Sequence, residues 1–342
     1  MLLPTPQELK TRYALDSRTR EFIHSSRQTA KDIVTRKDPR LVIIVGPCSI
    51  HDPIQGLEYA KRFKELSERI DSSCFLIMRA YIEKARTLSG WKGLVYDPDL
   101  DESHDLEEGL EKARSFFIEL AKMEVPVATE FLSPLVSPYI DDLVTWGFIG
   151  ARTSASQIHR EIASHLPFPV GFKNSLDGNV DTAIYGVISS RDPHIFFHVG
   201  EQGRLCKVKS HGNPYAHVVH RGSIKSTNYD VQSIQETVKK MDDLGLVPRL
   251  LVDCAHGNSQ KDYEKQKEVF YSVLEQIEQG NRKILGMMLE SHLKAGCQPL
   301  SALPGFLEEG ISITDPCINW LETEELLLSI EESCSSLLSS SI

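Results

Sequence analysis

The sequence has no long hydrophobic run. Its longest uninterrupted apolar stretches, such as residues 41–45, are far shorter than the roughly 18 residues that suggest a membrane span. The N-terminal residues, MLLPTPQELKTR, also lack the long apolar segment and the small-residue cleavage site of a secretory signal peptide. We therefore expect a cytoplasmic protein that has no membrane partner.

Paired cysteines are missing as well. The seven cysteines are scattered along the chain and include no C-x-x-C pair, which argues against a disulfide framework, a zinc ribbon and a thioredoxin-like site. The motifs G-x-x-x-x-G-K-[ST], G-x-G-x-x-G and H-E-x-x-H are also absent. Nucleotide-binding folds and zinc proteases therefore lack their usual signatures here.

Basic residues are fewer than acidic residues. The formal net charge is −10, from 38 Lys and Arg against 48 Asp and Glu. We expect no nucleic-acid partner, because a phosphate backbone favours a basic surface. An anionic substrate would need a local basic pocket within this acidic chain.

Short apolar runs alternate with amphipathic stretches through the sequence. The chain has 342 residues, of which 41% are hydrophobic, enough for a substantial core. Strands are predicted at residues 41–46, 75–80, 125–131, 148–153, 169–174, 217–222, 249–254 and 284–290. Helical spacing occurs between them, for example at 56–70, 107–123, 231–245 and 263–280. Eight strands joined by helices predict an α/β fold of the (β/α)8 TIM-barrel type, with a doubly wound open sheet as the alternative.

Three segments lie outside this alternation. Residues 1–40 are predicted to form an N-terminal helical arm, and 194–213 a β-hairpin inserted before the sixth strand. The barrel is expected over 41–330, and the Ser-rich residues 331–342 form a C-terminal tail. The arm and the hairpin are candidate surfaces for an oligomer.

A polar residue capable of chemistry lies at or just after the end of every predicted strand. In a barrel these positions converge on one face, where active sites are built. Taken singly, a strand-end cation is more often half of an ion pair and a lone cysteine more often a core residue. The eight residues are Cys48, Arg79, Glu130, Arg152, Lys173, Arg221, His256 and Glu290.

The cations form one chemical set. Arg79, Arg152, Lys173 and Arg221 are joined by Lys84 and Arg86 from the segment EKARTLSGWKG after the second strand. Arginine grips phosphate and carboxylate oxygens with two parallel hydrogen bonds. The set predicts a small polyanionic substrate.

The remaining residues are potential metal ligands. Cys48 in the segment GPCSIHDP is a core thiol, a nucleophile or a ligand, and His256, Glu290 and Asp315 in SITDPCINW offer further donors. One thiolate, one imidazole and two carboxylates suit a divalent transition metal. Manganese, iron and zinc all fit.

Seven motifs together resemble one enzyme family. They are GPCSIHDP, EKARTLSGWKGL, IGARTSASQIHRE, PVGFKNSLDG, DCAHGNSQKDY, LESH and SITDPCINW, in collinear order. They resemble the microbial class I 3-deoxy-D-arabino-heptulosonate 7-phosphate (DAHP) synthases, which are (β/α)8 barrels. The resemblance implies a transferase that condenses phosphoenolpyruvate with erythrose 4-phosphate, at the first step of the shikimate pathway. It also favours a homodimer or homotetramer.

The resemblance also implies roles for individual residues. Cys48, His256, Glu290 and Asp315 would bind one divalent metal ion. Phosphoenolpyruvate would be held by Arg79, Lys84, Arg152, Lys173 and Arg221, with Glu130 near its reacting end. Arg86 and Thr87 would hold the phosphate of erythrose 4-phosphate, and Lys84, Glu130, His256 and Asp315 are the expected catalytic residues. Ala85 departs from the family pattern, which has proline in this loop.

Two alternatives remain open at this stage. One is a related sugar-acid synthase that uses another aldose phosphate, such as arabinose 5-phosphate. The other is a non-catalytic barrel that binds metal or phosphate. The Lys-x-Arg-Thr loop at 84–87 favours the four-carbon substrate, and the full set of ligands and cations favours catalysis.

Overall fold

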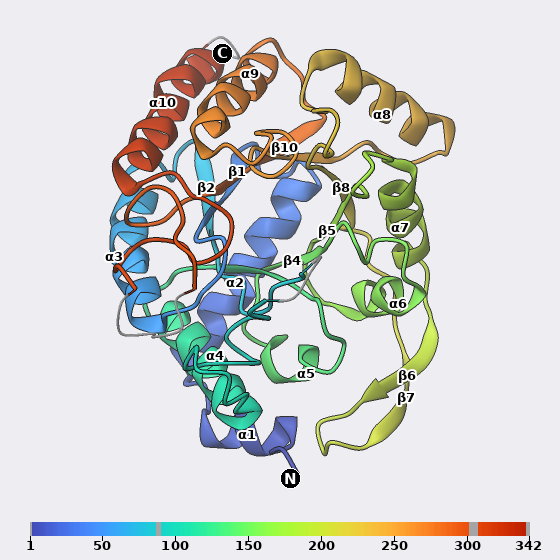
Figure 1. Cartoon of the computed structure of the whole chain (residues 1–342). Coiled ribbons are helices and arrows are strands. Elements are labelled where there is room, and N and C mark those ends of the chain that lie inside the picture. Colours follow the sequence, from blue (N-terminus) through green and yellow to red (C-terminus); the bar gives the residue numbers. More distant parts are fainter. Residues whose placement is uncertain (1, 87–89, 301–306, 340–342) are drawn as a thin grey trace.

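Eight parallel strands close into a barrel in the computed structural model, which describes residues 2–86, 90–300 and 307–339 (Figure 1). The order around the barrel is β1-β10-β9-β8-β5-β4-β3-β2, and β1 pairs in parallel with both β2 and β10. The strands are β1 (Leu41–Gly46), β2 (Cys74–Arg79), β3 (Val127–Glu130), β4 (Trp146–Ile149), β5 (Val170–Lys173), β8 (His217–His220), β9 (Leu250–Asp253) and β10 (Ile284–Glu290). The predicted barrel is confirmed, and its closure rules out the open sheet.

Helices surround the barrel. They are α3 (Pro53–Arg69), α4 (Leu106–Lys122), α5 (Ser137–Ile140), α6 (Gln157–His165), α7 (Asp181–Arg191), α8 (Val231–Asp243), α9 (Gln266–Glu278) and α10 (Trp320–Ser339), with the short 3-10 turn η1 (Tyr263–Lys265) before α9. Several begin at an aspartate: the side chains of Asp52, Asp105 and Asp230 each accept a hydrogen bond from a backbone N–H of the first turn. Among the described residues, no helix is long and apolar enough to cross a bilayer.

The strands are buried on both faces, which explains their unbroken apolar sequences. In β1, Val42 and Ile44 belong to the cluster that fills the barrel, whereas Leu41, Ile43 and Val45 pack in the layer between strands and helices. Successive side chains of a strand point to opposite faces, so only every second residue can reach the barrel interior.

The N-terminal arm consists of α1 (Pro6–Arg12) and α2 (Ser17–Val34). The last turns of α2 contribute Ala30, Ile33 and Val34 to the cluster inside the barrel. The opposite end of the barrel is therefore left for the site. Residue 331 lies within α10, which continues to Ser339 past the expected start of the tail.

The inserted hairpin is present where it was predicted. β6 (Ile195–Val199) and β7 (Leu205–Lys209) pair antiparallel, and Figure 1 shows them reaching toward α1. The backbone N–H of Gln7 donates to the backbone oxygen of Glu201 at 2.8 Å. The arm and the hairpin thus contact each other directly.

His217 gives the barrel core an acid-sensitive element. Its ring is fully buried in an edge contact with Trp146, at 4.9 Å between ring centroids, and burial lowers its pKa to about 3. The unfolded chain takes up this proton near pH 6.5, so stability is retained above that pH and falls as the pH drops toward 3.

We predict that His217→Gln removes about 2 kcal/mol of the stability loss between pH 7 and pH 5. The measurement is the urea unfolding free energy at both pH values. His24→Gln, at an exposed position of α2, is the matched control and should keep the wild-type pH dependence. Equal pH dependence in the His217 variant and the wild type would contradict this account.

Candidate active site

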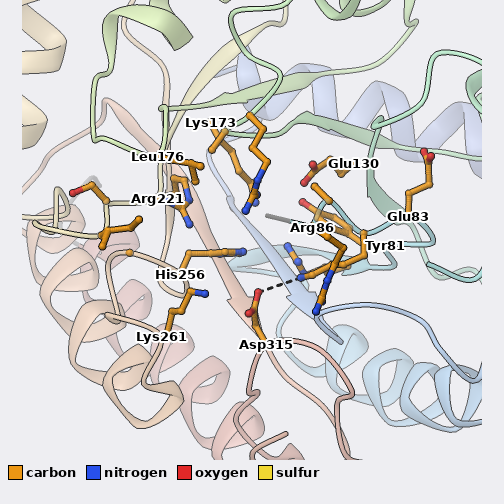
Figure 2. A pocket seen from close by; sticks show the side chains of 18 of the residues that line it. Tyr81, Glu83, Arg86, Glu130, Lys173, Leu176, Arg221, His256, Lys261 and Asp315 are labelled. Atoms are coloured by element: carbon orange, nitrogen blue, oxygen red, sulfur yellow. Dashed lines mark hydrogen bonds and ion pairs between the residues drawn. The ribbon is translucent and has the colours of Figure 1, made fainter. Parts of the chain in front are cut away.

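A cavity of about 570 Å³ opens at the C-terminal ends of the strands. Nine predicted site residues line it: Arg79, Lys84, Arg86, Glu130, Arg152, Lys173, Arg221, His256 and Asp315. Figure 2 shows Arg221 and His256 entering from one side and Glu130 and Arg86 from the other. Cys48 and Glu290 are buried and are not among the lining residues, and Thr87 lies outside the described residues.

Three donor atoms gather beside the cavity. The Cys48 thiol and one carboxylate oxygen each of Glu290 and Asp315 lie within 4.8 Å of one another. His256 Nε2 reaches this group at 3.6 Å from Glu290 Oε1. Three of the four predicted ligands therefore form one compact group, and the fourth, His256, lies next to its Glu290 member.

The chemistry of these donors fits a cation. Lys84 Nζ lies 2.7 Å from Cys48 Sγ and 3.2 Å from Asp315 Oδ2, so a positive charge already sits among them. Burial and the Glu290 carboxylate raise the pKa of Cys48 to about 12. A bound divalent ion has the opposite effect on a thiol, because a coordinated thiol is deprotonated.

Arg79 holds the Glu290 carboxylate and the backbone at Cys48 in place. Its guanidinium is fully buried, donates to Glu290 Oε1 at 2.8 Å and donates to the backbone oxygens of Pro47 and Cys48 at 3.2 and 3.1 Å. Its guanidinium carbon lies 3.6 Å from the centre of the Tyr81 ring. Burial alone would raise the pKa of Glu290, but neighbouring positive charges, including those of Arg79 and Lys84, outweigh it and the pKa is lowered.

The other cations line the cavity wall. Lys173 and Arg221 are buried, and burial lowers the pKa of both. Arg152 and Arg86 are exposed at the rim. The cavity thus contains a buried basic end and a solvent-exposed basic end, an arrangement that suits a substrate pair with several negative charges.

His256 is positioned by an unusual backbone. Its φ is 56°, in the left-handed region, and the loop after it is closed by a hydrogen bond from Lys261 N to the His256 oxygen at 2.8 Å. Non-glycine residues rarely adopt this conformation, and such residues are frequent at functional sites.

Two acidic residues of the site were not predicted from the sequence. Asp253, at the end of β9, is fully buried and lies 2.9 Å from His256 Nδ1. It follows Leu251, an interior residue, by two positions, so strand alternation could have indicated it. Glu83 lines the cavity, and burial raises its pKa to about 8. Its neighbours along the chain gave no signal for this role.

Glu130 and Glu83 are positioned by different contacts. A Cβ on Gly150 would lie 2.2 Å from Glu130 Oε1, so a larger residue there would displace the Glu130 carboxylate from its present position. Glu83 accepts hydrogen bonds from Tyr96 Oη and Ser133 N, both at 3.2 Å. The Glu83 carboxyl therefore links the loop after β2, which carries Lys84, to the loop after β3.

Residues 20–328 match the model of the DAHP synthetase I family. The chain is 45% identical over 331 residues to the Tyr-sensitive phospho-2-dehydro-3-deoxyheptonate aldolase of Escherichia coli strain K12, covering 97% of this chain and 93% of the relative. It is 42% identical over 326 residues to the Trp-sensitive aldolase of Salmonella typhimurium, covering 95% and 93%.

Solved structures agree with this relationship. The phospho-2-dehydro-3-deoxyheptonate aldolase of Francisella tularensis superimposes with a TM-score of 0.94 at 38% identity, covering 97% of both chains. The enzyme of Thermotoga maritima, at 16% identity and a TM-score of 0.56, shares the fold. The sequence match over most of the chain, together with the motifs that converge on this cavity, shows that the chain belongs to the DAHP synthetase I family.

Proposed function

We propose that this chain condenses phosphoenolpyruvate with D-erythrose 4-phosphate and water, giving DAHP and phosphate in the first step of the shikimate pathway. The observation that carries the proposal is one cavity that joins a buried set of cations to a thiol, imidazole and carboxylate donor set. Membership of the DAHP synthetase I family supports the same reaction.

Each of the two basic ends of the cavity would bind one of the substrates. Lys173 and Arg221 lie at the buried end and would hold phosphoenolpyruvate, together with Arg79, Lys84 and Arg152. Arg86 at the rim, with Thr87, would hold the phosphate of erythrose 4-phosphate. The fixed cations offset the repulsion between two phosphorylated substrates and orient them for attack.

Cys48, His256, Glu290 and Asp315 would hold one divalent ion, with manganese, iron and zinc as the candidate metals. Such an ion supplies Lewis-acid polarisation of the aldehyde oxygen. Asp315 and His256 line the cavity, and Cys48 and Glu290 are buried beside Asp315 in the same donor group, so the donor set borders the space for the aldehyde.

The remaining steps would use side chains of the cavity. C3 of phosphoenolpyruvate attacks the aldehyde carbon, and Lys84 Nζ delivers a proton to the oxygen that becomes an alkoxide. Burial alone would lower the pKa of Lys84, but Cys48 and Asp315 raise it, so the ammonium form is available. Glu130 takes a proton from the water that adds at C2, and the phosphate group then leaves with its bridging oxygen.

We further propose that the protein is cytoplasmic and forms a homodimer or homotetramer. The outer face of the β6–β7 hairpin supports an oligomer, because Ile195, Phe197 and Leu205 are 67%, 81% and 72% exposed. Several exposed apolar side chains on one short element are typical of interaction surfaces.

The reaction itself is tested by following the loss of enolpyruvate absorbance. With both substrates and Mn²⁺, absorbance should fall, EDTA should abolish the loss, and added Mn²⁺ should restore it. Full activity after metal removal would contradict the Lewis-acid role. Turnover with arabinose 5-phosphate in place of erythrose 4-phosphate would identify the related sugar-acid synthase, and no turnover with either would contradict catalysis.

We predict that Cys48→Ser weakens Mn²⁺ binding at least about tenfold, because a hard and mostly neutral hydroxyl replaces a thiolate. Equilibrium titration with Mn²⁺ measures this directly. Cys74→Ser is the matched control: Cys74 is equally buried but begins β2 at the other end of the barrel, so its loss should leave the affinity unchanged. Equal affinities in the Cys48 variant and the wild type would rule out ligation.

Two arginine variants should separate the substrates. Arg221→Ala is expected to raise the KM for phosphoenolpyruvate tenfold or more and change the KM for erythrose 4-phosphate little, since a charged hydrogen bond contributes about 1.5–3 kcal/mol. Arg86→Ala should show the opposite pattern. Arg249→Ala, next to the start of β9 and remote from the cavity, serves as the control. The reverse order of effects would overturn the substrate assignment.

A further inference from the structure

The buried carboxylate of Asp253 lies between a predicted metal ligand and a cation that is proposed to bind phosphoenolpyruvate. Asp253 Oδ2 lies 2.9 Å from His256 Nδ1, on the side of the metal ligands, and 3.3 Å from Lys173 Nζ, on the side of phosphoenolpyruvate. The other oxygen, Oδ1, accepts the backbone N–H of Ala255 at 3.1 Å. Asp253 itself is not among the residues that line the cavity, so it has no direct access to a substrate.

Asp253 and Lys173 form a buried ion pair. The Asp253 side chain is fully buried, and its Oδ2 atom lies 3.3 Å from Lys173 Nζ. Lys173 depends on this contact in turn. Its side chain is 3% exposed, and among the described residues its only ion pair is with Asp253. Removing one partner of a buried pair leaves the other charge uncompensated.

The same carboxylate oxygen lies beside the His256 ring at hydrogen-bonding distance, and within the described residues neither atom has another hydrogen-bond partner. With Nδ1 beside Asp253, the opposite nitrogen, Nε2, lies 3.6 Å from Glu290 Oε1 in the donor set. The backbone of β9 and of the His256 loop is braced as well, because Asn258 Nδ2 donates to the Asp253 backbone oxygen at 2.9 Å. A histidine ligand that donates its second ring N–H to a carboxylate has a fixed ring orientation and tautomer, and Asp253 Oδ2 is the acceptor placed to receive this hydrogen bond.

We propose that Asp253 is a positioning residue that serves metal binding and phosphoenolpyruvate binding at once. It directs His256 Nε2 toward the metal ligands and holds the Lys173 ammonium in the substrate cavity. The identity of the two ligands rests on the proposed function. Loss of the Asp253 charge should therefore weaken both kinds of binding and leave the erythrose 4-phosphate end, at Arg86, unaffected.

The first test is Asp253→Asn, which keeps the size and the Oδ1 acceptor but removes the charge. Mn²⁺ affinity is expected to fall 10- to 100-fold by equilibrium titration. At saturating Mn²⁺, the dissociation constant of phosphoenolpyruvate is expected to rise about tenfold, whereas the KM for erythrose 4-phosphate stays within about twofold. In a folded variant, unchanged affinity for either Mn²⁺ or phosphoenolpyruvate would overturn the double role.

Asp142→Asn is the matched control. Asp142 pairs at 2.8 Å with Arg114, whose side chain is 1% exposed, between α4 and α5 and away from the cavity. This variant also breaks the ion pair of a buried cation, but it should leave both affinities at the wild-type value. Reduced affinities in this control would show that the effects report general loss of stability, and would overturn the assignment to Asp253.

A second measurement uses the unmodified chain and remains decisive if the Asp253 variant does not fold. In the zinc-loaded protein with ¹⁵N-labelled histidine, His256 should carry its proton on Nδ1 and bind metal through Nε2. The His256 signals are assigned by their absence in His256→Gln. A His256 ring with an unprotonated Nδ1 would overturn the proposal. Neither the binding nor the tautomer measurement needs turnover, so failure of the proposed reaction and failure of this inference are separate results.

Discussion

The buried ion pair between Arg79 and Glu290 is the interaction on which the site is built. Its two side chains are 0% and 2% exposed, and their charged atoms are 2.8 Å apart. Burying two charges costs several kcal/mol per ion unless further contacts compensate. Here Arg79 also donates to two backbone oxygens next to β1 and stacks on Tyr81. The pair therefore links the ends of β1, β2 and β10 and fixes Glu290, one of the proposed metal ligands.

Inward-facing residues of the strands are apolar along most of the barrel and charged at its C-terminal end. Inward residues near the start and middle of the strands, such as Val42, Ile44 and Leu251, fill the interior with apolar side chains, and α2 contributes to the same cluster. The next inward positions, at the strand ends, carry Arg79, Lys173 and Glu290. Charges that would be costly in the apolar layer are thus collected at one end of the barrel, where they compensate one another, and Arg79 and Lys173 line the cavity.

Much of this arrangement could be predicted from the sequence, for identifiable reasons. Apolar runs bounded by polar residues located all eight strands, because a strand buried on both faces leaves a continuous apolar sequence. The strand-end rule found Arg79, Lys173 and Glu290 without any knowledge of their contacts. Arg152 was expected inside a strand, but β4 ends at Ile149, so Arg152 lies in the following loop.

Other features depend on tertiary contacts that no local pattern reveals. Asp253 was hidden within an apolar strand segment, and its importance comes from Lys173 and His256, which are brought beside it by folding. The raised pKa of Glu83 is caused mainly by burial, which depends on how the loops after β2 and β3 cover it. The position of Lys84 among the metal ligands likewise follows from the barrel and not from its spacing along the chain.

The central claim is that four distant residues form one metal site at the mouth of the barrel. It is tested most directly by anomalous X-ray diffraction from a crystal grown with Mn²⁺ and phosphoenolpyruvate. The account predicts one manganese peak ligated by Cys48, His256, Glu290 and Asp315, with phosphoenolpyruvate against Lys173 and Arg221. Manganese bound elsewhere, or bound in the cavity without Cys48, would contradict it.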